Sequence, residues 1–237
     1  MLQQSMEVGS HRVSGRLWRV VAVLAIVHVV LMFGSFSLQR VAPLGAAEST
    51  VTADHVTWPM GKGFTGGYLT CLSFLVFLLV ATLLARLLRG DSEASGWAAS
   101  VIAGAGSVYV AVTLTGALAN LGAALYDGHR GAPLTTVTAL DHVHWFAAFL
   151  ATAVLGLFTL AVAAAVHLTA ALPRWVAFTG YVVGAVAVCW VPGAAKGLVD
   201  TATLVWVVWF IAPAVAASRR SGHAVVVAGA ATVASRG

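Results

Sequence analysis

The sequence predicts an all-α membrane protein, a bundle of six transmembrane helices with both termini in the cytoplasm. Hydrophobic residues make up 60% of the 237 positions and charged residues only 9%, whereas soluble domains are about a quarter charged. The mean hydropathy is +0.93, and six apolar stretches each hold at least the roughly 17 residues that a membrane span needs. A soluble globule of this composition could not cover its surface with polar groups, so that class is excluded.

The predicted spans form a single transmembrane domain, 1–237, with approximate limits 17–37, 67–89, 97–126, 138–170, 174–191 and 198–217. The first span follows three arginines, and its apolar run is long for a signal sequence, so we expect it to remain uncleaved. The extracytoplasmic loop 38–66 contains two prolines, Trp58 and Met60, which favour a segment packed over the bundle. The stretch 221–237 is expected to be a flexible tail.

Small residues and tryptophans support the individual spans. Gly180 and Gly184 form a GxxxG pattern on the fifth span, which permits close helix approach. Pro213 is expected to kink the sixth span. The third span carries a small-residue face made of Gly104, Gly106 and Gly116. Tryptophans fall at the predicted inner ends of spans, as in the aromatic belts of membrane proteins; they are Trp18, Trp97 and Trp175.

The basic residues set the predicted orientation. Nine of the 13 Lys and Arg residues fall on the side of the two termini, and the other side carries Arg40, Lys62, Arg130 and Lys196. Because basic residues concentrate on the cytoplasmic side, both termini are predicted to be cytoplasmic. The net charge of +5 then reflects arginines against anionic lipid, and no nucleic-acid partner is expected.

The densest group of titratable residues is Asp141-His142-Val143-His144-Trp145. Asp141 and His144 are three positions apart and therefore share a helical face. A carboxylate beside imidazoles is suited to proton transfer, and it could also supply metal ligands. Asp141 lies roughly 40 Å along the helix from the inner end, which places it in the headgroup layer. It could therefore simply begin an interfacial helix.

Other polar residues fall in or near the apolar segments. His28 is the deepest titratable side chain, and Asp200 follows Lys196 at the i,i+4 spacing of a helical ion pair. Polar groups of the third, fourth and sixth spans gather in the predicted outer half. We therefore predict an outward-opening pocket between these spans, with Asp141, His144 and Asp200 as catalytic groups and a lining of Asn120, Trp145, Phe146, Trp190 and Trp206.

The two cysteines, Cys71 and Cys189, lie at the predicted outer ends of their spans. The sequence therefore permits either a disulfide between them or two free thiols. No CxxC or other metal-ligand spacing occurs, and neither a metal nor a cofactor is expected. Haem would require paired axial histidines at matching depth, and His28 has no obvious partner at its own depth.

The stretch from about 67 to 217 resembles six-span bacterial membrane proteins of a domain-of-unknown-function type that is common in actinobacteria. The resemblance rests on Leu172-Pro173-Arg174-Trp175, on the Gly180/Gly184 helix that follows and on the Arg219-Arg220 end. It implies a fold and topology but no activity.

Two functions remain open from the sequence. The first is a membrane-embedded acid/base enzyme of the cyclase or isomerase type in the bacterial plasma membrane, acting on a prenylated or lipid-like substrate, although such cyclases commonly carry an intramembrane Glu and this chain has none. The second is a non-enzymatic accessory subunit or a small efflux or resistance protein. Membrane lipids are the expected partners, and a protein partner or a homo-oligomer stays open.

Overall fold

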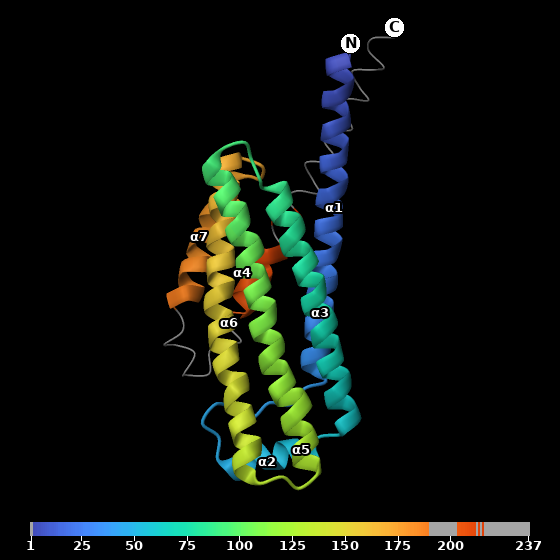
Figure 1. Cartoon of the computed structure of the whole chain (residues 1–237), viewed down its shortest axis with the longest axis vertical. Coiled ribbons are helices and arrows are strands. Elements are labelled where there is room, and N and C mark those ends of the chain that lie inside the picture. Colours follow the sequence, from blue (N-terminus) through green and yellow to red (C-terminus); the bar gives the residue numbers. More distant parts are fainter. Residues whose placement is uncertain (1, 190–202, 212, 214, 216–237) are drawn as a thin grey trace.

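The computed structural model describes residues 2–189, 203–211, 213 and 215, with side chains from residue 15 onward. Every regular element in these residues is a helix, as the sequence predicts. The long helices lie side by side along the molecule, and α2 and α5 lie together at the end opposite the N-terminus (Figure 1). The elements are α1 (Leu2–Ser37), α2 (Glu48–Thr57), α3 (Met60–Leu87), α4 (Glu93–Ala117), the π-helix η1 (Leu118–Ala124), α5 (Leu125–His129), α6 (Leu134–Thr169) and α7 (Arg174–Cys189), followed by a helical segment at 203–211.

Four helical stretches are long and apolar enough to cross a membrane, and the protein is accordingly treated as an integral membrane protein. They are Gly15–Ser37, Met60–Leu87, Glu93–His129 and Leu134–Thr169. The predicted fifth span corresponds to α7, an apolar helix of only 16 residues. Of the predicted sixth span, 198–217, the structure describes 203–211, 213 and 215. The six-span topology therefore stays a prediction.

The helices extend beyond several predicted limits, and the local sequence explains why. α3 begins directly after Pro59, several residues before the predicted limit at position 67. The prediction began too late because the first turns of α3 are rich in glycine and contain Lys62, which lowers the local hydropathy. α4 begins after Ser92, whose Oγ accepts a hydrogen bond from the Ser95 amide, as expected of an N-cap. α6 begins after Pro133 and ends at Thr169, and the next residue, Ala170, has a left-handed backbone with φ of 50°.

Close helix contacts depend on glycines. α6 packs against α4 on one side and α7 on the other. A Cβ on Gly184 would lie 2.9 Å from the carbonyl oxygen of Gly156, so these two glycines bring α6 and α7 into backbone contact. This agrees with the predicted packing role of Gly184. A Cβ on Gly106 would lie 2.7 Å from Cβ of Ala81, which likewise fixes the contact between α4 and α3.

Buried apolar side chains of α1, α3, α4, α6, α7 and the 203–211 segment form the main core. Phe77 and Phe158 are fully buried, and the 203–211 segment contributes Trp206, which is 1% exposed. Trp206 Nε1 donates a hydrogen bond to Thr159 Oγ1 of α6 over 3.0 Å, so its polar atom is satisfied within the core. This contact positions the 203–211 segment against α6.

A smaller apolar cluster holds α2 onto the end of the bundle. It consists of Ala42, Val51, Ala124 and Val137. α2 lies within the loop 38–66, which the sequence predicts to be packed over the bundle. It packs against both α5 and α6 (Figure 1).

Candidate functional site

The candidate site is a polar cluster beneath α2, made of the buried residues Asn120, Asp141 and His55 and the partly buried His144. The first three come from η1 and α6, and His55 comes from α2. Asn120 and Asp141 are 1% and 2% exposed, and His55 is 3% exposed. We call these four residues the capped cluster.

Asp141 is the centre of the capped cluster. Its Oδ1 accepts a hydrogen bond of 2.8 Å from Asn120 Nδ2. The carboxyl group also interacts electrostatically with the imidazoles of His144, His55 and the exposed His142. A buried carboxyl group with several imidazoles around it can exchange protons with them, because each group can hold the charge that the other releases.

The π-helix η1 positions Asn120 for this contact. A π-turn widens the helix by one residue per turn, and such turns are frequent at functional sites. η1 continues directly from α4 into α5, and it packs along α6. The side chain of Asn120 thereby meets Asp141 from the neighbouring helix.

Gly116 allows His144 to approach α4. His144 Nδ1 donates a hydrogen bond to the carbonyl oxygen of Gly116 over 3.3 Å. A Cβ on Gly116 would lie 2.8 Å from Cβ of Ala147 and 3.3 Å from the carbonyl oxygen of His144. The absence of a side chain at position 116 is therefore needed for this contact. With the proton on Nδ1, the neutral imidazole of His144 keeps the lone pair on Nε2.

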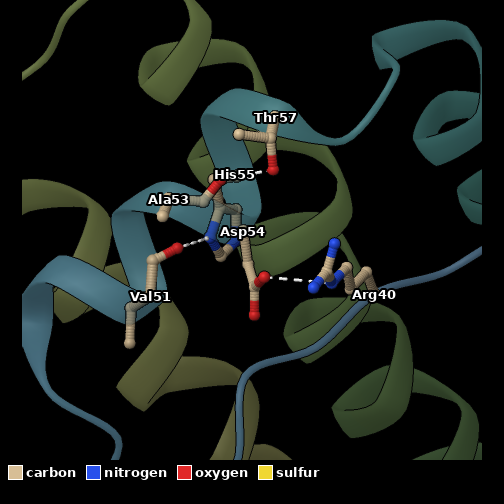
Figure 2. Close-up of polar contacts among 6 residues, drawn as sticks. All are labelled: Arg40, Val51, Ala53, Asp54, His55 and Thr57. Carbon is tan, nitrogen blue, oxygen red and sulfur yellow. Dashed lines mark hydrogen bonds and ion pairs between the residues drawn. The ribbon is translucent and has the colours of Figure 1, made fainter.

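His55 presents the same tautomer from α2. Its Nδ1 donates to the carbonyl oxygen of Val51 over 2.8 Å, as Figure 2 shows. Its Nε2 is buried and has no hydrogen-bond partner among the described residues. The α5 helix packs closely against it, because a Cβ on Gly128 would lie 3.1 Å from Cβ of His55.

Several other buried polar atoms near the capped cluster also lack partners within the described part of the chain. Thr138 and Trp145 lie three positions before and four positions after Asp141, so they share its face of α6. The unpartnered atoms are Thr138 Oγ1, Trp145 Nε1 and, on α2 one turn before His55, Thr52 Oγ1. Buried polar groups in native proteins are nearly always hydrogen-bonded, and the described residues supply no partner for these atoms.

Residues of the connection between α1 and α2 hold α2 in place. Arg40 Nε lies 3.0 Å from Asp54 Oδ1 of α2, an ion pair drawn in Figure 2. Trp58, directly after α2, donates from Nε1 to the carbonyl oxygen of Leu38 over 3.1 Å. These contacts hold α2 over Asp141.

The structure shows an unbroken helix between Asp141 and Thr169, so the predicted depth of the capped cluster can be restated from its length. Asp141 is 28 residues before Thr169, which corresponds to about 42 Å along a helix and exceeds a hydrocarbon core of about 30 Å. If the core begins at the Thr169 end, Asp141 therefore lies at the level of the lipid headgroups.

The structure brings together only part of the predicted site. Asn120, Asp141 and His144 meet, and the Trp145 ring centroid lies 5.7 Å from that of His144. Phe146 is 69% exposed and faces away from the cluster. Trp206 packs against Thr159 in the middle of the bundle, 18 positions along α6 from Asp141, so it belongs to a different region. Asp200, Lys196 and Trp190 lie outside the described residues.

His55 lies in the predicted loop 38–66, and the sequence did not assign it to the site. Its only signal was a histidine in a loop expected to cover the bundle, and only the folding of α2 aims that histidine inward. Thr138 and Gly116 were also missed as site residues.

Metal and cofactor binding can be tested against these residues. Among the residues that the structure describes, no three His, Cys, Asp or Glu side chains converge as metal ligands. Cys71 and Cys189 are both free thiols, on α3 and α7.

The chain matches no protein-family model, curated protein or solved structure. The resemblance to domain-of-unknown-function proteins therefore stays a prediction.

Proposed function

We propose that the protein is a six-span enzyme of the bacterial plasma membrane that carries out acid–base chemistry on a lipid-like molecule. The reaction takes place in the capped cluster, on the extracytoplasmic side. Asp141 acts as the general acid, and His144 or His55 acts as the base. The substrate is prenylated or otherwise lipophilic, with its reacting carbon atoms at the level of the lipid headgroups and its chain in the bilayer.

The observation that carries this proposal is the buried carboxyl group of Asp141, which interacts with the imidazoles of His144 and His55. Because Nδ1 of each imidazole donates to a backbone carbonyl, each neutral ring keeps a lone pair on Nε2. In an isomerisation, Asp141 gives its proton to one carbon of a double bond, which leaves a carbocation. An imidazole Nε2 then takes a proton from a neighbouring carbon, and the double bond re-forms one position along. The imidazolium returns its proton to the Asp141 carboxylate, so the cluster is restored and no other reactant is needed.

Deuterium transfer tests this chemistry on a whole mixture of lipids at once. The full chain is reconstituted with a bacterial lipid extract in D2O, and the lipids are analysed by mass spectrometry. Because the acid proton of Asp141 exchanges with solvent, at least one lipid species should gain deuterium bound to carbon. If no species gains deuterium at carbon, the proposed enzyme activity is wrong.

The burial of Asp141 favours a second candidate function. Asp141 is only 2% exposed, so a substrate reaches it only if α2 moves. If α2 does not move, the capped cluster simply fixes α2 to the bundle, as in a non-enzymatic accessory subunit or a small efflux protein. The same D2O experiment separates the two functions, since a structural cluster transfers no deuterium to lipid.

A further inference from the structure

α2 covers the capped cluster with few interactions of its own. Only two of its ten residues, Val51 and His55, are buried. Val51 is the one side chain of α2 in the small apolar cluster at the end of the bundle. Among the residues that the structure describes, no hydrogen bond joins α2 to α5 or α6, the helices against which it packs. α2 is therefore held by far less packing than the long helices are.

Polar atoms in this interface favour an open state. With α2 in place, Thr52 Oγ1 and His55 Nε2 of α2 and Thr138 Oγ1 of α6 are buried without a partner in the described part of the chain. When α2 lifts, water can bond to these atoms, which lowers the free energy of the open state relative to the closed one. The ion pair of Asp54 with Arg40 involves an arginine that is 55% exposed, and such a pair stabilises the closed state only weakly.

The two ends of α2 allow it to move as a unit. Gly45, three residues before the helix, has φ of 78°, and nothing lies within 4 Å of a Cβ built there. At the other end, Trp58 has an extended backbone with ψ of 130°, and its ring is anchored to the carbonyl oxygen of Leu38. Hinges are usually a few loop or helix-end residues that can absorb a change in backbone angles, and both positions are of this kind.

We infer that α2 is a lid over the capped cluster, which opens by turning at Gly45 and Trp58 while the bundle stays folded. Opening uncovers Asp141. Because α2 carries His55, closing brings this imidazole back to Asp141, so the acid and one base meet only after a lipid has entered. As a route to Asp141 the lid rests on the proposed function. The opening itself is measured without any reaction on lipid, so the two can fail separately.

Three histidines of the unmodified chain measure the opening, because diethyl pyrocarbonate acylates an imidazole nitrogen only when its lone pair is reachable. His129 of α5 is the exposed standard. Its Nδ1 donates to the carbonyl oxygen of Leu125 over 2.9 Å, which leaves it the same lone pair on Nε2 as His55. His28 of α1 is fully buried in the bundle and is the standard for unfolding. The full chain is purified in detergent, and acylation of each histidine is followed in time by peptide mass spectrometry.

The lid predicts that His55 reacts at a rate between those of the two standards. A closed state that is favoured by a factor of ten or more slows His55 at least about tenfold relative to His129. His28 should react more slowly still. If His55 reacts as slowly as His28, α2 opens only when the bundle unfolds. If it reacts as fast as His129, α2 does not cover it. Either result would overturn the inference.

Matched variants then test what holds the lid closed. Val51→Ala removes two buried methyl groups from the contact of α2 with the bundle, so acylation of His55 should become about tenfold faster while that of His28 stays the same. Val56→Ala makes the same change at an exposed position of α2 and should leave both rates unchanged. An equal rate for His55 in the two variants would contradict the lid. If Val51→Ala does not fold, the order of the three histidines in the unmodified chain still decides.

Discussion

Asn120 and Asp141 are 21 positions apart in the sequence, and the structure joins them by a hydrogen bond of 2.8 Å between Nδ2 and Oδ1. The π-helix η1 supplies one partner and α6 the other. Both side chains are almost completely buried. The position of η1 at the end of the bundle therefore affects the surroundings of the Asp141 carboxyl group. A change at either residue should therefore alter the surroundings of the other.

Replacing Asn120 by Ala should destabilise the protein. It removes the donor to Asp141 Oδ1 and leaves a buried oxygen unsatisfied, which costs about 1–3 kcal/mol. The free energy of unfolding measured in detergent by denaturant titration checks this. His142→Ala, at an exposed position on α6, should change stability far less. Equal stability of the two variants would show that the Asn120–Asp141 bond contributes little.

Gly116→Ala and Gly104→Ala should have opposite effects, although both place a methyl group on α4. At position 104 nothing lies within 4 Å of the new Cβ, so the higher helix propensity of Ala stabilises by up to about 1 kcal/mol. At position 116 the methyl group would lie 2.8 Å from Ala147 Cβ, so α4 and α6 must separate and the His144–Gly116 contact must weaken. Thermal unfolding of the two variants should move in opposite directions. A stabilised Gly116→Ala protein would mean that α4 and α6 tolerate a wider spacing.

The cap formed by α2 should protect the loop around it from protease. Arg40 and Lys62 are trypsin sites on either side of α2, and we expect slow cleavage in right-side-out vesicles. Val51→Asp places a charge in the small apolar cluster beneath α2 and should accelerate cleavage strongly. Ala53→Asp adds the same charge at an exposed position of the same helix and should leave the rate unchanged. Rapid cleavage of the unmodified protein would show that α2 is not held on the bundle.

Thiol labelling of intact cells should report the orientation. In a background with Cys71→Ser and Cys189→Ser, an impermeant maleimide should label Thr135→Cys, in the first turn of α6 on the α2 side. Asp91→Cys, between α3 and α4, should stay unlabelled until the cells are opened. Both positions are exposed, so the difference reports the side of the membrane. The reverse pattern would invert the proposed topology.

The helical class and the positions of four long apolar helices could be predicted from the sequence, because apolar length is a strong signal. The helix starts were less predictable, since Gly61, Lys62 and Gly63 hide the first turn of α3 from a hydropathy average. The sequence spacing predicted Asp141 and His144 on one face of a helix, and the electrostatic interaction between these two groups agrees with it.

The contribution of His55 could not be predicted, because it depends on how α2 docks rather than on local pattern. The place of Trp206 was equally hidden. The sequence predicted it in the lining of the outward-opening pocket, but its bond to Thr159 in the middle of the bundle depends on which helices are neighbours.

The most direct test of the proposed acid–base function is deuterium transfer from D2O to lipid by the unmodified protein and by Asp141→Asn. Asn keeps the volume of the side chain and can still bond with Asn120, but it holds no transferable proton. The unmodified protein should label one lipid species at carbon, and His142→Gln should label it at a similar rate. Asp141→Asn should be slower by about 10²–10⁴, the contribution typical of general acid catalysis. Equal labelling by Asp141→Asn at equal membrane abundance would contradict the proposed role of Asp141.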